Sequence, residues 1–297
     1  MTPLPALQLF TFGLLGLAIL ALWLPPVRLS ATVAVPPWIA LFGAAVVWAL
    51  FSGVLTLTGL AALAVFGALA QATGSAQWTP ALRIVAGIGT ALLGLALAVH
   101  KVPGFANPQL IAGVRFTPDA LPFTQYANFD KGAVGLLLLA FVCPRAASGA
   151  EWRTLLRRSW PIAAVTVSSV MLVAILTQVV RPALKWPDYT LVFLVTNLLL
   201  TCVAEEAFFR GFLQHLLAQR KPDSRSWQVA ALLLSAVLFG VAHLGGGAAY
   251  AMLATLCGVG YGAAFAATGR TEAAILTHFA FNAIHFVGFT YPAIASS

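Results

Sequence analysis

Two carboxylates and a guanidinium lie close together in an otherwise apolar part of the chain. Glu205, Glu206 and Arg210 follow the mostly apolar segment 191–204, in which nothing breaks a helix. Glu206 and Arg210 are four residues apart, so they share a helix face in the order that favours an ion pair. A charged side chain at the middle of a bilayer costs roughly 2.5–3.5 kcal/mol on insertion scales. We therefore expect these groups to face a protein interior or a wet cavity, where Arg210 keeps Glu206 ionised and Glu205 is available for chemistry.

Three more polar residues lie in apolar surroundings in the last third of the chain. His243 comes just before the glycine run Gly245–Gly247, and glycines let backbones approach closely. His278 and Asn282 are four residues apart, which places them on one helix face. A single residue of this kind is usually a satisfied structural hydrogen bond. Their combination with a paired carboxylate predicts one polar site to which three apolar segments contribute.

The composition is that of a membrane protein. Of the 297 residues, 61% are hydrophobic and 8% are charged, and the mean hydropathy is +0.94, whereas a soluble domain carries about 25% charged residues. The apolar runs are long and lack a period of two, which argues against a β-barrel. The sequence therefore predicts an all-α, polytopic helical membrane protein. The net charge of +8 is typical of basic cytoplasmic loops, so we expect no nucleic-acid partner.

A membrane-spanning helix needs about twenty apolar residues, and this length predicts about ten transmembrane helices, with nine as the alternative. The run 38–72 is too long for one crossing and is interpreted as two helices with a turn near Ser52 and Gly53. The other expected helices cover residues 5–24, 82–98, 132–143, 161–180, 191–214, 227–243, 249–267 and 273–289. Residues 101–131 form the only long polar connection and are expected to be an ordered external loop. One short loop is predicted to be cytoplasmic by the positive-inside rule, because it is expected to hold four arginines: Arg145, Arg153, Arg157 and Arg158.

The polar residues also resemble the motifs of a known protein family, the CAAX-endopeptidase and bacteriocin-processing intramembrane proteases (the CPBP or ABI family). They occur in the order and spacing of three motifs of that family: Glu205-Glu206-xxx-Arg210, Phe239-xxx-His243 and His278-xxx-Asn282. The likeness covers residues 188–289. It implies that Glu206 and Arg210 form a structural clamp that orients Glu205.

The same resemblance implies how the chain is organised and where it works. It implies a CPBP-like intramembrane protease domain over residues 159–297, preceded by accessory transmembrane helices over residues 1–158. The protein is then an integral, multi-pass protein of the bacterial inner (plasma) membrane. Its partners are the lipid bilayer and a membrane-embedded or lipid-anchored protein or peptide substrate.

The resemblance also implies a catalytic role for four residues. Peptide hydrolysis needs an activated nucleophile, a base and donors for the developing oxyanion. Glu205 resembles the base that deprotonates a water molecule, and His243 resembles its partner in holding that water. His278 and Asn282 resemble the family's oxyanion-stabilising pair.

Two mechanisms are open at this level. One is a glutamate-activated water without a metal, as in a glutamic-type protease. The other is a metalloprotease with zinc held by Glu205, His243 and His278, since three N or O ligands plus water are the usual catalytic arrangement. The chain has no HExxH helix, which is mild evidence against a zincin, and the amide of Asn282 is a poor zinc ligand but a good oxyanion donor. We therefore favour the mechanism that requires no cofactor, with zinc as the alternative.

These features predict an intramembrane endopeptidase that hydrolyses a peptide bond of a membrane-associated protein or peptide. Two other classes of protein carry similar residues. A proton- or ion-coupled transporter would use the charged residues and histidines as a relay, and it would keep partial function with other polar groups at His278 or Asn282. A non-catalytic, immunity-type membrane protein would keep its phenotype after Glu205→Ala.

Overall fold

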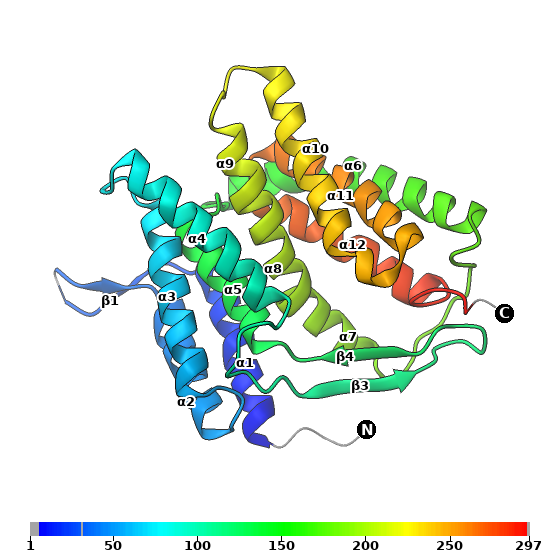
Figure 1. The fold of residues 1–297 in the computed structure, drawn as a ribbon, viewed down its shortest axis with the longest axis horizontal. Helices are drawn as coiled ribbons and strands as arrows, with labels where there is room; N and C mark the ends of the chain where they lie inside the picture. The colour runs from blue at the N-terminus through cyan, green and yellow to red at the C-terminus, as the bar shows by residue number, and fades with distance from the viewer. Residues whose placement is uncertain (1–5, 31, 296–297) are drawn as a thin grey trace. The chain divides into compact units, whose positions relative to one another are not determined.

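The computed structural model describes residues 6–30 and 32–295, and these are mainly helical (Figure 1). The described residues form ten continuous helices, which confirms the expected number; Pro5, the expected first residue of helix one, lies outside them. The helices are α1 (Ala6–Leu20), α2 (Pro37–Phe51), α3 (Leu57–Gly74), α4 (Pro80–Ala98), α5 (Phe129–Phe141), α6 (Gly149–Leu176), the continuous run α7–α9 (Thr190–Ala218), α10 (Arg225–Ala242), α11 (Ala248–Thr268) and α12 (Thr271–Gly288).

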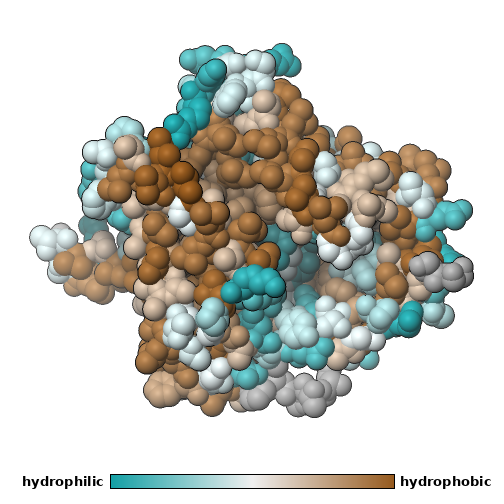
Figure 2. All heavy atoms as spheres, viewed as in Figure 1, coloured by the Kyte–Doolittle hydropathy of each residue, from teal (hydrophilic) through white to brown (hydrophobic). Residues whose placement is uncertain are grey.

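Seven helices are long and apolar enough to cross a membrane. Helix α12 has 18 residues but is not among the seven, and we attribute this to polar residues such as His278 and Asn282, which lower its mean hydropathy. Large apolar side chains are exposed on the outer faces of the helices, as for Leu176 at 72% and Leu92 at 67%. The face in Figure 2 is hydrophobic over most of the helical surface, whereas hydrophilic residues gather at the connection between α9 and α10. The chain is an integral, multi-pass membrane protein of all-α class.

The expected boundaries of helix α6 were wrong. The helix begins at Gly149 and not near Pro161, because Ser148 caps it: the Ser148 hydroxyl oxygen accepts from the Glu151 backbone N–H at 3.2 Å. Ser148 and Glu151 have the spacing of a capping box. Pro161 is inside the helix. Three of the four arginines expected in a loop are therefore on the helix: Arg153, Arg157 and Arg158.

The chain divides into two compact units. The first consists of Met1–Leu110, Tyr126–Val142 and Leu199–Ala204. Within it, α1 packs on α2 and α5, and α3 packs on α4 and α5. A short antiparallel pair, β1 (Val27–Arg28) and β2 (Ala34–Val35), joins α1 to α2.

A buried carboxylate ties together the end of α4 and the start of α5 in this first unit. The Asp130 side chain is 1% exposed, and its two oxygens contact His100 Nδ1 at 2.7 Å and Asn107 Nδ2 at 3.0 Å. His100 has a positive φ of 58°, a conformation that favours glycine or asparagine at a helix end. The histidine at this position is therefore explained by the contact of its imidazole with Asp130 and not by its backbone preference.

The second unit consists of Ile111–Gln125, Cys143–Leu198 and Glu205–Ser297. In it, α11 packs against α6, α10 and α12, and residues 207–214 pack against α10, α11 and α12. The polar connection expected as a loop contains two strands of one sheet, β3 (Gln109–Val114) and β4 (Phe123–Tyr126). The Phe123 ring lies 6.0 Å from that of Phe193 in α7, and Phe193 stacks on Phe286 of α12 at 4.0 Å. This aromatic cluster holds the strand segment against the helices that carry the polar residues.

Candidate active site

The expected ion pair is formed and fully buried. Arg210 Nη1 donates to Glu206 Oε1 at 2.9 Å, and both side chains are 0% exposed. Arg210 Nη2 donates to the Gly258 carbonyl of α11 at 3.1 Å. The guanidinium carbon lies 4.5 Å from the centre of the Phe239 ring and 5.3 Å from that of Tyr261. The two charges thus neutralise each other inside an aromatic enclosure.

Two glycines of α11 allow this helix to accept hydrogen bonds from the Glu205 helix. Arg210 donates to the Gly258 carbonyl, and Gln214, one turn later, donates to the Gly262 carbonyl at 3.1 Å. A Cβ atom at Gly258 would lie 3.1 Å from Arg210 Nη2, and one at Gly262 would lie 2.9 Å from Gln214 Oε1. Gln214 was not among the predicted site residues, although its four-residue spacing from Arg210 matches the spacing of the two glycines.

His278 is held between the two adjacent carboxylates. Its Nδ1 lies 2.8 Å from Glu206 Oε1, and its Nε2 lies 4.0 Å from Glu205 Oε2. Tyr261 stacks on the imidazole, with 4.5 Å between ring centres and 15° between planes. Because a carboxylate oxygen only accepts, Nδ1 carries the proton, and Nε2 is the atom directed towards Glu205.

The environments of the two carboxylates differ. Glu206 Oε1 accepts hydrogen bonds from both Arg210 and His278, so these two contacts fix the His278 ring. The resemblance implied instead that Glu206 and Arg210 orient Glu205. The Glu206 side chain is 0% exposed, whereas that of Glu205 is 14% exposed. Glu205 is thus the carboxylate of the pair that small molecules can reach.

His243 joins the cluster through an aromatic ring. It directly follows α10, and its Nδ1 donates to the Phe239 carbonyl at 2.7 Å. The Phe239 ring lies 4.5 Å from the His243 ring and 5.8 Å from the His278 ring, edge-on to the latter at 89°. The backbone bond fixes the proton on Nδ1, so a neutral His243 presents the lone pair of Nε2.

Asn282 lies one turn after His278 on α12 and pairs with a residue of the Glu205 helix. Its Nδ2 donates to Asn197 Oδ1 at 3.1 Å. Asn197 is 6% exposed. The structure therefore joins Glu205, Glu206, Arg210 and His278 by short distances, brings His243 to them across Phe239, and links Asn282 to Asn197.

The helix that carries the two carboxylates is irregular. Its segments Asn197–Cys202 and Ala207–Gln214 are π-helical and flank the α-helical turn Val203–Glu206. Side chains from outside the helix donate hydrogen bonds to carbonyls of the second segment. Ser235 Oγ donates to the Phe209 carbonyl at 2.7 Å, and Cys143 Sγ donates to the Ala207 carbonyl at 3.3 Å. π-Helical turns are rare and occur frequently at functional sites.

The described residues contain no preformed group of three metal ligands. Within residues 6–30 and 32–295, no three His, Cys, Asp or Glu side chains are grouped as ligands of one metal ion. A catalytic zinc needs three such side chains about 2 Å from one point.

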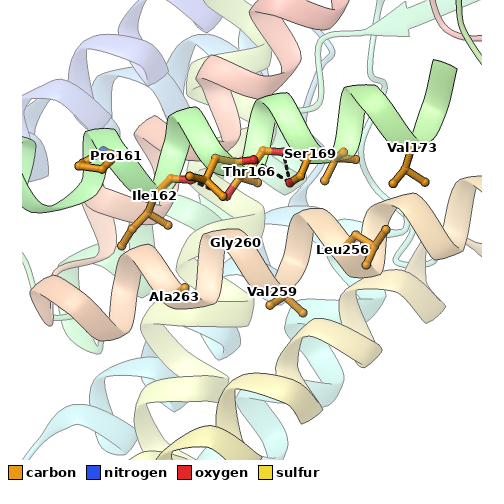
Figure 3. Close-up of a pocket in the computed structure, with 11 residues that line it drawn as sticks. Pro161, Ile162, Thr166, Ser169, Val173, Leu256, Val259, Gly260 and Ala263 are labelled. Carbon is orange, nitrogen blue, oxygen red and sulfur yellow. Dashed lines mark hydrogen bonds between the residues drawn. The ribbon is translucent and has the colours of Figure 1, made fainter. Parts of the chain in front are cut away.

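A separate apolar groove lies between α6 and α11 in the same unit (Figure 3). Its volume is about 550 Å³, and none of the expected site residues lines it. The hydroxyls of Thr166 and Ser169 face it but donate to carbonyls of their own helix, at 2.7 and 2.6 Å. The groove is thus apolar and carries no chemistry of its own.

Comparison with known proteins bears on the segment that holds the site. Residues 186–284 match the family described as Type II CAAX prenyl endopeptidase Rce1-like, whereas no curated protein and no solved structure matches the chain. The matched segment contains all three motifs from which the resemblance was inferred. Over that third of its length, the chain is similar to the type II CAAX prenyl endopeptidase Rce1-like family, which confirms the resemblance.

Proposed function

We propose that this protein is an intramembrane endopeptidase in which Glu205 activates a water molecule to hydrolyse a peptide bond. The observation that carries this proposal is the position of Glu205 Oε2, 4.0 Å from His278 Nε2. This separation is too long for a direct hydrogen bond but places both atoms within reach of one bridging water. The family match of residues 186–284 supports a peptidase over a transporter or an immunity-type protein.

In the proposed reaction, Glu205 acts first as a base and then as an acid. Glu205 takes a proton from the water, whose oxygen bonds to the carbonyl carbon of the peptide. The C–N bond then breaks, and Glu205 returns the proton to the departing nitrogen. Because neutral His278 keeps its proton on Nδ1, it can donate from Nε2 only as an imidazolium.

Stabilisation of the oxyanion then comes from Asn282, and from His278 when that ring is protonated. Both lie on one face of α12, one turn apart. A donor that is fixed before the reaction contributes more than one that must reorient, since no reorganisation is needed when charge develops. His243 completes the site by accepting from the water at Nε2.

The family description and the membrane helices support one class of substrate. We propose that the substrate is a membrane-anchored protein or peptide of the bacterial inner membrane, cleaved next to a prenylated cysteine near its C-terminus. A lipid anchor would hold such a substrate at the depth of helices α10–α12. The first 158 residues then serve as accessory helices.

The test compares membranes from cells that express the wild type, Glu205→Gln or Asp223→Asn. Glu205→Gln keeps the size of the side chain but removes the base, whereas Asp223 is exposed in the loop after α9 and serves as the control. Mass spectrometry of protein C-termini should show a shortened product with the wild type and the control, and an uncut precursor with Glu205→Gln. Equal amounts of product with all three proteins would refute the proposal.

Metal dependence is tested separately. We expect purified protein to keep its activity after dialysis against a chelator, because the preferred mechanism uses only side chains and water. Loss of activity that zinc alone restores would establish the metalloprotease alternative.

A further inference from the structure

Asn197 is a buried polar residue to which the proposed mechanism assigns no task. It stands where α7 gives way to the first π-helical segment, eight residues before Glu205. Its side chain is buried, with the residue 6% exposed. An amide so deep in an apolar helix is costly unless its polar atoms are used.

The partner of Asn197 is the expected oxyanion donor. Asn282 Nδ2 donates to Asn197 Oδ1 at 3.1 Å, across 85 residues of chain. One turn earlier on α12, His278 is fixed by Glu206 Oε1 at 2.8 Å. The Glu205 helix thus binds the two predicted site residues of α12, His278 and Asn282, through side chains that are themselves buried.

The geometry of a side-chain amide gives this contact a consequence. The last torsion of an asparagine has broad, poorly separated preferences, so an unheld amide samples many orientations. An amide nitrogen has two hydrogens in one plane. When one of them is bound to Asn197 Oδ1, the direction of the other is determined as well.

We propose that Asn197 is a positioning residue, which fixes the amide plane of Asn282 so that its second N–H is directed at the developing oxyanion. This inference rests on the proposed endopeptidase function. Asn197 acts through Asn282 and does not touch the substrate. In this pair, Asn282 is the donor to the oxyanion, and Asn197 is the acceptor that orients it.

The experiment measures kcat and KM for an internally quenched peptide that ends in an S-farnesylated CaaX sequence, with purified protein in detergent. Asn197→Leu removes the acceptor at similar size, and Asn197→Asp keeps an acceptor oxygen. We expect Asn197→Leu to lower kcat about tenfold with KM unchanged, which is less than the roughly 10²–10³-fold loss on removal of an oxyanion donor. Asn197→Asp should stay within about threefold of the wild type, because the N–H of Asn282 retains its acceptor.

A double-mutant cycle separates positioning from general stability. In an Asn282→Ala background, Asn197→Leu should lower kcat no further, because the amide that it orients is gone. Equal losses in both backgrounds, or equally low kcat for the Leu and Asp variants, would overturn the inference. Thermal unfolding of the same four proteins gives a readout that needs no turnover, and a zero coupling energy between positions 197 and 282 would also overturn it.

The controls keep this inference apart from the proposed function. If the wild type and Glu205→Gln cleave the peptide equally, the endopeptidase proposal fails, and the unfolding cycle still decides whether the two amides are coupled. If only Glu205→Gln is inactive and Asn197→Leu retains full kcat, the endopeptidase stands and the positioning role is wrong. Should Asn197→Leu not purify as a folded protein, Asn197→Ala takes its place in the same cycle.

Discussion

Removal of the buried guanidinium is the perturbation for which the structure gives the clearest magnitude. Arg210→Met keeps a long apolar side chain but leaves the carboxylate of Glu206, which is 0% exposed, with one partner fewer. Loss of one member of a buried ion pair costs about 3–5 kcal/mol. The bond to the Gly258 carbonyl is lost as well, at about 1 kcal/mol.

This cost should appear directly in thermal unfolding. At roughly 2–4 °C per kcal/mol for a chain of this order of size, the 3–5 kcal/mol for the ion pair alone lowers Tm by about 6–20 °C. The double variant Arg210→Met/Glu206→Leu should recover much of that loss, because replacing both members of a buried pair with apolar groups is often close to neutral. Both variants should be inactive. The double variant lacks the carboxylate at Nδ1 of His278, and Arg210→Met lacks the guanidinium that holds this carboxylate in place.

The assay is differential scanning fluorimetry in detergent, with peptide cleavage measured on the same preparations. Arg220→Met is the matched control, because Arg220 is exposed after α9, and its Tm should equal that of the wild type. The reasoning is refuted if Arg210→Met unfolds at the temperature of the control. It is also refuted if the double variant is less stable than Arg210→Met alone, because the surviving carboxylate would then not be the source of the cost.

Three further predictions concern other parts of the chain. Gly240→Ala should cost about 1–3 kcal/mol of stability, because a Cβ there would lie 2.8 Å from a backbone oxygen of α11, whereas Gly245→Ala, with no atom within 4 Å, should leave Tm unchanged. Burial lowers the pKa of Lys185, in the loop before α7, from 10.5 to about 8. Between these two pH values the unfolded chain keeps a proton that the folded chain has lost, so stability rises with pH. Tm should therefore rise from pH 8 to 10 in the wild type, and Lys185→Met should lack this rise. His100→Gly should lower Tm although glycine suits its positive φ, because Asp130, 1% exposed, loses a bond of 2.7 Å; an unchanged or higher Tm would mean that the imidazole is dispensable.

Hydrophobic length predicted most of the fold. The turn expected near Ser52 and Gly53 separates α2 from α3 as predicted, because a run of thirty-five residues is too long for one crossing. The start of α6 was missed because the length rule ignores polar helices, and the arginines of its first three turns extend beyond the apolar stretch. The strands of the long connection were also missed, because they are short and the connection is held by ring contacts with other helices: Phe123 of β4 contacts α7, and Phe116, between the strands, contacts α12.

The sequence predicted one contact of the candidate site but not the contacts between helices. The four-residue spacing predicted the Glu206–Arg210 bond correctly, because both residues are on one helix. Spacing along one helix carries no information about partners on another, so the bond from His278 to Glu206 could not be foreseen. The roles in catalysis stay predictions, which the variants of Glu205 and Asn197 test.

The buried pair explains how one helix can present two adjacent carboxylates to the same imidazole and use them differently. Buried ion pairs add little to stability compared with apolar residues of the same size, so stability alone does not account for Glu206 and Arg210. What the pair provides is a fixed negative acceptor at Nδ1 of His278, 2.8 Å away, whose charge is balanced by Arg210. That acceptor determines which imidazole nitrogen is directed at Glu205, the carboxylate that is 14% exposed. Since a base must be reached by water whereas a positioning group need not be, the difference in exposure between the two neighbouring residues supports the proposed roles, with Glu205 as the base and Glu206 as the group that positions His278.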